Sequence, residues 1–334
     1  MNRLKVGVIG LGYFGSRHAR IHARHPAAHL VAVCDLDPQA AARVASATGA
    51  EPMTDPLALL ARDDIDAVSL CLPDRQHEAL AVAAARAGKA TLLEKPMAHT
   101  AAAARRIAQA VESSGARMMV GHILRFDPRY VQVHAAAAPD RLGQVIHVRA
   151  KRNGIRDTAR RLGNASSILF YMGVHDVDAM QWIARSRISR VFARKREVLG
   201  TGNEDALYAV VDFENGAIGM LDYSWAWPNG MMNGYRAAFE IVGTRSAAAL
   251  DVTDQGFCTI DDTGTAGADT HLWPEINGRI VGDLADEIDH FLMATLTGAP
   301  YVQPWQEALD TIPVLDALAE SAGSGQPVTV IRGS

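Results

Sequence analysis

The sequence predicts an α/β fold in which a doubly wound parallel sheet is followed by an α/β domain with an open-faced, largely antiparallel sheet. Within residues 1–121, short β-branched runs alternate with Ala-rich helical stretches, as in right-handed βαβ units. Beyond Gly121, strand-like runs follow one another without helices between all of them, which favours mixed or antiparallel pairing. We therefore expect two domains, residues 1–121 and residues 122–334.

The first domain is expected to alternate strands and helices in a regular order. Strands are expected at residues 5–9, 30–34, 67–72, 90–93 and 117–120. Helices are expected at residues 16–24, 39–47, 77–86 and 101–112. The many alanines in these helices place small side chains where a helix must approach a sheet closely.

The second domain is expected to be built on strands at residues 145–150, 206–213, 217–223, 235–242 and 246–250. Glu214-Asn215-Gly216 predicts a hairpin, because Asn and Gly tolerate positive φ. Helices are expected at residues 173–184, 280–296 and 304–322. The last opens with a proline suited to a first turn and can pack back on the first domain.

Composition excludes several classes of function. The net charge of −4 provides no basic field for nucleic acid. No run of eighteen apolar residues and no N-terminal targeting segment is present, so we expect a cytoplasmic protein without a membrane partner. Cys34, Cys71 and Cys258 are far apart, which fits neither a disulfide framework nor a zinc site, and we expect them to be reduced and buried.

A glycine-rich turn carries the strongest local signal. Gly10, Gly12 and Gly15 enclose Tyr13 and Phe14, directly after one predicted strand and directly before a helix. In this context the first glycine permits a tight turn, the second lets the backbone approach a pyrophosphate, and the third lets helix and strand pack. The five residues are candidates for dinucleotide binding, with a purely structural turn as the alternative.

Asp35 strengthens the dinucleotide interpretation. It lies twenty residues beyond Gly15, at the end of the second predicted strand, where a carboxylate binds the ribose hydroxyls and repels a 2'-phosphate. The expected cofactor is NAD, with NADP less favoured, although Arg43 could relax that preference.

Several motifs together resemble the Gfo/Idh/MocA family of glucose-fructose oxidoreductase and inositol dehydrogenase-like enzymes. Besides the glycine turn and Asp35, they are the stretches 73–77, 87–89, 94–96 and 173–178. The resemblance implies an N-terminal Rossmann domain and a C-terminal α/β domain whose open sheet often serves for oligomer contacts, as a homodimer or homotetramer. It implies catalytic roles for Lys95 and His175, and adds to the candidates for cofactor binding Pro73, His77, Glu94 and Lys95.

The chemistry of these two residues suits alcohol oxidation. A base must take the hydroxyl proton while hydride leaves the same carbon, and a cation must stabilise the developing alkoxide. His175 can serve as the base, because imidazole titrates near neutral pH. Lys95 can serve as the cation. The alternatives are a surface lysine at a strand end and a solvent-facing histidine.

The substrate side is less well defined. Many family members have an aspartate four residues before the histidine, where this chain has Tyr171, and a phenol does not supply a carboxylate's charge at neutral pH. The departure weakens an assignment to inositol. Asp178 can orient the imidazole, bind a substrate hydroxyl or be merely solvated. The candidates for substrate binding are Arg125, Asn153, Tyr171 and Asp178.

Two basic clusters allow further interpretations. One crowds a turn-rich segment and could hold a sugar acid, although a solvated loop or oligomer contact is favoured; its members are Arg149, Lys151, Arg152, Arg156, Arg160 and Arg161. The other, His18, His22 and His25, has metal-ligand spacing on one predicted helix. We expect an ordinary exposed face there and no metal.

The leading hypothesis is an NAD-dependent dehydrogenase acting on a secondary hydroxyl of a sugar, polyol or sugar acid. Two alternatives stay open. One is an enzyme that recycles tightly bound NAD within one turnover, and the other is a redox-silent protein that senses NAD or a sugar, since fold alone does not certify catalysis.

Overall fold

The computed structural model describes residues 3–253, 256–262 and 264–332. The chain forms two compact units, each made of two segments. The first comprises Met1–Ile123 and Leu272–Leu309, and the second comprises Leu124–His271 and Asp310–Ser334. The expected division into residues 1–121 and 122–334 therefore sets the boundary two residues too early and differs from the structure mainly at residues 272–309. These residues join the first unit because their helix α10 (Asp283–Thr297) buries Leu284, Ile288 and Phe291 there.

The first unit contains a six-stranded parallel sheet of order β3-β2-β1-β4-β5-β6. The bounds are β1 Leu4–Ile9, β2 Ala28–Cys34, β3 Glu51–Met53, β4 Ala67–Leu70, β5 Ala90–Glu94 and β6 Met118–Gly121. This order confirms the doubly wound fold and brings the carboxyl ends of all strands to one edge.

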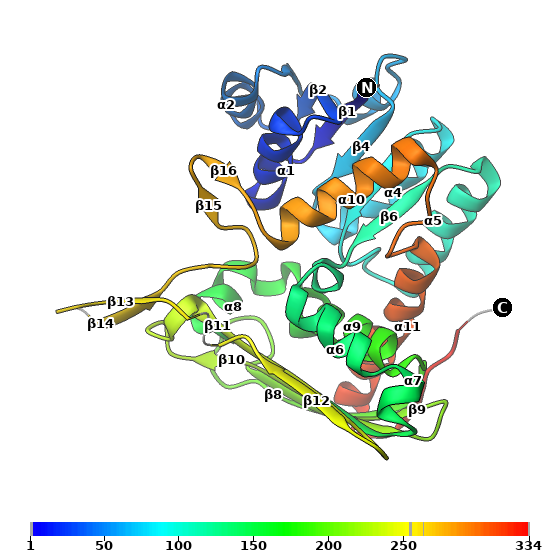
Figure 1. Ribbon diagram of the computed structural model, residues 1–334, viewed down its shortest axis with the longest axis vertical. Coiled ribbons are helices and arrows are strands. Elements are labelled where there is room, and N and C mark those ends of the chain that lie inside the picture. Colours follow the sequence, from blue (N-terminus) through cyan, green and yellow to red (C-terminus); the bar gives the residue numbers. More distant parts are fainter. Residues whose placement is uncertain (1–2, 254–255, 263, 333–334) are drawn as a thin grey trace. The chain divides into compact units, whose positions relative to one another are not determined.

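Helices lie on both faces of this sheet (Figure 1). Besides α10 they are α1 Tyr13–Arg24, α2 Pro38–Thr48, α3 Pro56–Leu60, α4 Asp74–Arg86 and α5 Ala101–Ser114. Asp37 and Thr100 cap the first turns of α2 and α5 with their side chains, and Gly49 and Gly115 end them in the left-handed conformation. The sequence did not predict β3 and α3, because three and five residues are too short for a periodic pattern.

The second unit contains a seven-stranded sheet of order β12-β11-β7-β10-β9-β8-β17. The bounds are β7 Val145–Ile155, β8 Ile188–Arg196, β9 Ala206–Phe213, β10 Ile218–Trp227, β11 Tyr235–Gly243, β12 Ala247–Asp251 and β17 Val328–Thr329. Among the strand pairs that the structure describes in this sheet, β7 and β10 pair in parallel, whereas the others are antiparallel. The mixed sheet is as expected, and Gly216 adopts φ 85° in the predicted β9–β10 hairpin.

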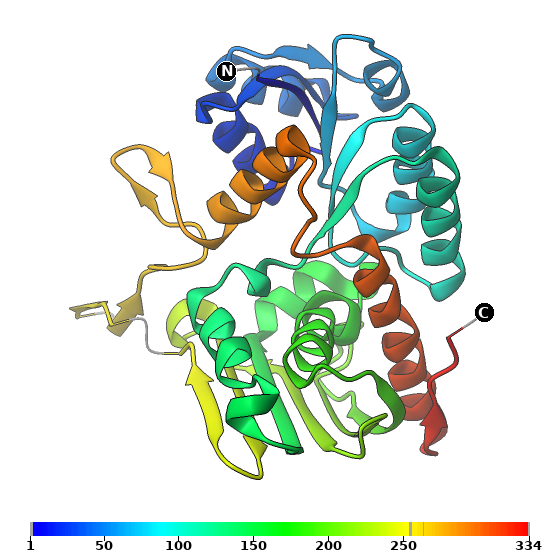
Figure 2. The same cartoon turned by 45° about the vertical axis from the view of Figure 1, so that its right-hand side comes forward.

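The helices of the second unit lie on one face of its sheet, and the other face is open (Figures 1 and 2). They are α6 Pro128–Ala136, α7 Pro139–Leu142, α8 Arg156–Leu162, α9 Val174–Ala184 and, from Asp310 onward, α11 Trp305–Ser324. Single turns complete this part of the chain: η1 Ile123–Arg125, η2 Gly163–Ala165, the π-helical η3 Leu169–Gly173 and η4 Met232–Gly234.

Two small hairpins precede α10: β13 Cys258–Asp261 with β14 Gly264–Gly267, and β15 Glu275–Ile276 with β16 Arg279–Ile280. Because β16 includes Ile280, the helix expected from residue 280 begins only at Asp283. Cys258 is exposed on β13 and Cys71 is only partly buried, so the expectation that all three cysteines are buried is confirmed for Cys34 alone. In the described part of the chain, no helix combines the length and the apolar character needed to cross a membrane.

Candidate functional site

The glycine turn of the first unit has the geometry that a dinucleotide requires. Gly10 has φ 85°, and a Cβ atom on it would overlap the carbonyl oxygen of Cys71. A Cβ on Gly15 would overlap the carbonyl oxygen of Gly10, whereas a Cβ on Gly12 would meet nothing within 4 Å. Two of the glycines are therefore needed for the turn itself, and Gly12 leaves an open space at the start of α1, where backbone N–H groups attract phosphate.

Asp35 lies next to this turn at the end of β2. Its Oδ2 accepts a hydrogen bond of 2.7 Å from the backbone N–H of Leu11, and its Oδ1 accepts one of 2.9 Å from that of Asp37. Each carboxylate oxygen can accept a further hydrogen bond. The side chain is therefore held in a defined orientation and retains acceptor capacity for ribose hydroxyls.

A cavity of about 290 Å³ opens beside the turn. Gly10, Gly12 and Asp35 line it together with Leu36 and Pro73. Pro73 also precedes the first residue of α4. Apolar walls with a few polar groups suit the adenosine half of a dinucleotide.

His77 has a different environment from that of a ligand-facing residue. Its ring is fully buried, with Nδ1 2.8 Å from the carbonyl oxygen of Pro96 and Nε2 2.8 Å from that of Leu72. Burial lowers its pKa, and a neutral imidazole has one N–H to donate to these two carbonyls. The histidine thus links α4 to the backbone beside Lys95.

Glu94 and Lys95 follow one another at the end of β5, and both are half-buried. Oε2 of Glu94 accepts the backbone N–H of Lys95 at 3.2 Å, and Oε1 lies 3.2 Å from Nε2 of His18. Burial alone would raise the pKa of Glu94, but the hydrogen bond from His18 and nearby positive charges bring it below its usual value. Glu94 is therefore a carboxylate that fixes the backbone of Lys95.

Tyr13 and Phe14 contact an aromatic residue that the sequence analysis did not single out. Trp273 packs edge-on against Tyr13 and Phe14, with ring centroids 6.2 Å and 5.1 Å away, and its indole N–H donates to the Tyr13 hydroxyl at 3.2 Å. No motif marks Trp273, because it lies 260 residues from Tyr13 along the chain.

In the second unit, His175 lies half-buried in the first turn of α9. The next residue, Asp176, is fully buried and forms a two-pronged ion pair with Arg152 of β7, at 3.0 Å and 2.8 Å. The same guanidinium donates to the hydroxyl of the buried Tyr130 at 3.3 Å. This network ties α9 to the sheet and so positions His175.

Asp178 and Arg125 form a second buried ion pair. Nε and Nη2 of Arg125 donate to the two carboxylate oxygens of Asp178 at 3.1 Å and 2.8 Å, and both side chains are only 2% exposed. Asp178 is therefore not a solvated carboxylate. The guanidinium also lies over the ring of Trp182, 5.3 Å from its centroid.

Tyr171 and Asn153 complete the predicted substrate set. Tyr171 lies in η3, half-buried, with its hydroxyl 3.5 Å from Nη2 of Arg161 and its ring 6.0 Å from that of Trp225. Asn153 is 2% exposed, and its Oδ1 has no hydrogen-bond partner among the described residues. A buried amide oxygen of this kind suits a ligand hydroxyl.

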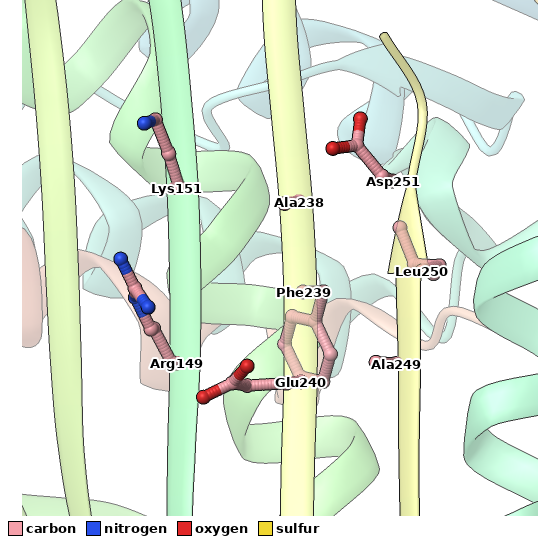
Figure 3. Close-up of a pocket in the computed structure, with 8 residues that line it drawn as sticks. All are labelled: Arg149, Lys151, Ala238, Phe239, Glu240, Ala249, Leu250 and Asp251. Atoms are coloured by element: carbon pink, nitrogen blue, oxygen red, sulfur yellow. The ribbon is translucent and has the colours of Figure 1, made fainter. Parts of the chain in front are cut away.

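The basic cluster predicted from residue 149 onward does not form one patch. Its residues belong to β7 and α8 rather than to a turn-rich segment, so neighbours along β7 point to opposite faces of the sheet. Arg152 is buried, whereas Arg149 and Lys151 line a hollow of about 340 Å³ on β7, β11 and β12, with Glu240 and Asp251 (Figure 3).

The histidines of α1 are also placed differently from expectation. His18 and His22 are fully buried rather than exposed, because α1 packs between the sheet and α10. Nε2 of His22 lies 2.9 Å from the Ser69 hydroxyl, and Nε2 of His25 lies 2.9 Å from Oδ1 of Asp289. Each histidine thus has its own partner.

Comparison with protein-family models covers most of the chain. Residues 4–122 match a model described as an oxidoreductase family with an NAD-binding Rossmann fold. Residues 130–249 match the model of a GFO/IDH/MocA C-terminal domain.

Individual relatives agree with these matches. The chain is 32% identical over 254 residues to an inositol 2-dehydrogenase of Rubrobacter xylanophilus, covering 74% of this chain and 71% of that protein. It is 27% identical to an inositol 2-dehydrogenase of Rhizobium meliloti, covering 98% and 99%. Among solved structures, GenD2 from gentamicin A biosynthesis in complex with NAD has a TM-score of 0.88 and 27% identity, covering 99% and 97%.

Proposed function

Because the chain belongs to the Gfo/Idh/MocA family of NAD-binding oxidoreductases that act on CH–OH groups, we propose that it oxidises a secondary hydroxyl of a sugar, polyol or sugar acid. The observation that carries the proposal is the open space in front of Gly12, next to the oriented carboxylate of Asp35. NAD, when bound, supplies the hydride acceptor, and the reaction is reversible.

Lys95 stabilises the substrate oxygen in this proposal. As the hydroxyl loses its proton, negative charge develops on the oxygen, and an ammonium group lowers the free energy of that charge. The hydrogen bond from the Lys95 backbone N–H to Glu94 supports this role, because it fixes the main chain from which the side chain extends.

His175 takes the hydroxyl proton during oxidation and returns it during reduction. Imidazole exchanges protons near neutral pH. Its position in the first turn of α9, next to the buried Asp176–Arg152 pair, supports a fixed orientation of the ring. Asp178 and Arg125 act in this proposal as an ion pair whose opposite charges cancel and which forms part of the wall of the substrate site.

Asn153 and Tyr171 contact substrate hydroxyls in this proposal. The relatives named inositol 2-dehydrogenases make a cyclic polyol the first substrate to test. Because Tyr171 stands where many family members have an aspartate, we expect a substrate that needs no carboxylate contact at this position.

The test is NADH formation across polyols, aldoses and sugar acids, with Lys95→Ala and His175→Ala beside the unchanged protein. Each variant is expected to lose at least about a hundredfold in kcat while it retains NADH binding within about threefold. A kcat equal to that of the unchanged protein in either variant would remove that residue from the mechanism. NAD binding without turnover on any compound would favour the sensor instead.

We further propose that the open face of the seven-stranded sheet joins copies of this chain. Exposed apolar side chains on this face support the proposal: Phe192, Tyr208, Val210, Ile218 and Met220. Light scattering after size exclusion tests it. Val210→Asp is expected to yield monomers, whereas the control Leu57→Asp, at an exposed position of the first unit, should keep the oligomer. A monomeric unchanged protein would contradict this proposal.

A further inference from the structure

A second acidic residue lies close to Glu94 within the first unit, and the proposed mechanism does not use it. Glu287 of α10 is 1% exposed. Across the described residues, neither of its carboxyl oxygens has a hydrogen-bond partner. Burying such a group is unfavourable, so its presence asks for a physical explanation.

Gly121 shows where the two acids meet. It ends β6 and pairs with Glu94 of β5. A Cβ atom on Gly121 would lie 3.5 Å and 3.6 Å from the two carboxyl oxygens of Glu287, and 3.6 Å from Oε1 of Glu94. Both carboxyl groups therefore reach the same small space, which exists because residue 121 has no side chain.

The two acids differ in protonation. Burial, followed by the charges of Glu94 and Asp283, raises the pKa of Glu287 well above its usual value. Burial raises the pKa of Glu94, but the hydrogen bond from His18 and nearby positive charges outweigh burial, so that this pKa is lowered. Two carboxyl groups that share a site hold one proton between them, and here Glu287 is the neutral member.

We propose that Glu94 and Glu287 form a proton-holding pair at the nicotinamide half of the cofactor site, and that its proton is linked to the charge of the nicotinamide. In a sheet of order 3-2-1-4-5-6, each half binds one mononucleotide. Asp35 ends β2 in one half, whereas Glu94 and Gly121 end β5 and β6 in the other.

The physical link is the charge of the ring. Oxidised nicotinamide is positive and reduced nicotinamide is neutral, so an ionised Glu287 attracts only the oxidised form. Through its charge, Glu287 thus changes the relative affinity of the site for oxidised and reduced cofactor. The inference rests on the NAD site of the proposed function and on no property of the substrate.

Other titratable groups lie on the elements around the pair. They are His18 and His22 of α1, Cys71 after β4, His77 of α4, Lys95 after β5, His122 after β6, and Asp283 of α10. Burial and the two glutamates raise the pKa of Cys71, so it stays a neutral thiol. Burial and the charges of His18 and His25 lower the pKa of His22, so it stays a neutral imidazole.

Dissociation constants for NAD and NADH, measured from pH ~6 to ~9, test the link without any substrate. In the unchanged protein, NAD is expected to bind about tenfold more tightly as Glu287 ionises, with NADH changing much less. Glu287→Gln keeps the shape but carries no charge, and it should abolish this pH dependence. Asp286→Asn, at an exposed position of the same helix, is the matched control and should behave like the unchanged protein.

Persistence of the pH dependence in Glu287→Gln, or an equal dependence for both cofactors, would overturn the proposal. Should that variant not fold, infrared spectra of the unchanged protein with isotope-labelled glutamate decide. The carbonyl stretch of a neutral carboxylic acid is expected at neutral pH and should vanish on alkaline titration; its absence at neutral pH would equally overturn the proposal. A chain inactive on every alcohol would still yield both results, so failure of the proposed dehydrogenase activity is distinguishable.

Discussion

Asp35 is held in place by the chain before it binds anything. The backbone N–H groups of Leu11 and Asp37 point at its two oxygens, so no rotation is needed to present the carboxylate to a ribose. Glu94 has a similar arrangement, with His18 on one oxygen and the Lys95 backbone on the other. In both cases the carboxylate contributes to function because the protein has already fixed its orientation, so no free energy is needed to order the side chain.

Asp35→Asn is expected to weaken NAD binding by about tenfold, because charge-assisted hydrogen bonds are lost. NADP binding should improve at the same time, since the repulsion of a 2'-phosphate disappears. Asp37→Asn is the matched control, because Asp37 caps α2 through Gln39 and carries the same charge. Equal changes of the NAD and NADP dissociation constants in Asp35→Asn would contradict the assigned role.

His22 makes the folded state sensitive to acid. Burial, followed by the charges of His18 and His25, lowers its pKa, so the folded chain resists a proton that the unfolded chain accepts. The contribution of His22 to the free energy of unfolding is therefore fully present above pH ~6.5. It decreases below that pH, by up to about 1.4 kcal/mol per pH unit.

Urea unfolding at several pH values measures this effect. His22→Gln retains a polar partner for Ser69 and should show a flatter acid limb than the unchanged protein. The exposed His29→Gln should not. Parallel plots of unfolding free energy against pH for the His22→Gln and unchanged proteins would show that the folded chain does not exclude a proton from His22.

At the scale of elements, α1 has two separate tasks. Its first turn provides the open N-terminus at Gly12, and its buried face places His18 and His22 against the sheet. The residues 272–282 run along the same helix, with Trp273 on Tyr13 and a 2.8 Å ion pair between Glu275 and Arg20. One helix therefore organises parts of the chain that lie far apart in sequence.

The glycine turn offers a matched pair of substitutions. Gly12→Ala adds a methyl group to open space, so stability should change by less than about 1 kcal/mol while NAD binding weakens at least tenfold, since the pyrophosphate needs that space. Gly15→Ala forces a clash with the backbone of Gly10 and should cost about 3 kcal/mol or more. Thermal unfolding and NADH fluorescence separate the two effects. Unaltered NAD affinity in Gly12→Ala would place the phosphates elsewhere.

At the scale of the whole molecule, the first unit is discontinuous in sequence. The segment Leu272–Leu309 belongs to it, and α10 buries there Leu284, Ile288, Phe291 and Leu292. Each such side chain contributes about 2 kcal/mol on burial. Without α10, the apolar surface that these side chains cover would face water.

Residues 1–121 expressed alone are therefore expected to aggregate or to bind a hydrophobic dye. Residues 1–123 joined to residues 272–309 by a flexible linker should unfold cooperatively. Circular dichroism and dye fluorescence compare the two fragments. A shorter fragment that unfolds cooperatively without binding dye would show that α10 is dispensable.

The sequence by itself determined the parallel sheet, the glycine turn, the β9–β10 hairpin and the family. These depend on local periodicity and on residues whose backbone freedom is visible in one dimension, such as Gly10 and Asn215. β8 escaped prediction because charged residues occupy its exposed positions, as in Ile188–Arg196.

Tertiary structure alone decided which side chains meet. Spacing along the chain showed neither that His18 faces Glu94, nor that Asp178 pairs with Arg125, nor that Trp273 lies on Tyr13. Such contacts join segments separated by 53 to 260 residues. Burial then sets the charge of each group, because desolvation depends on everything packed around it and on no sequence motif.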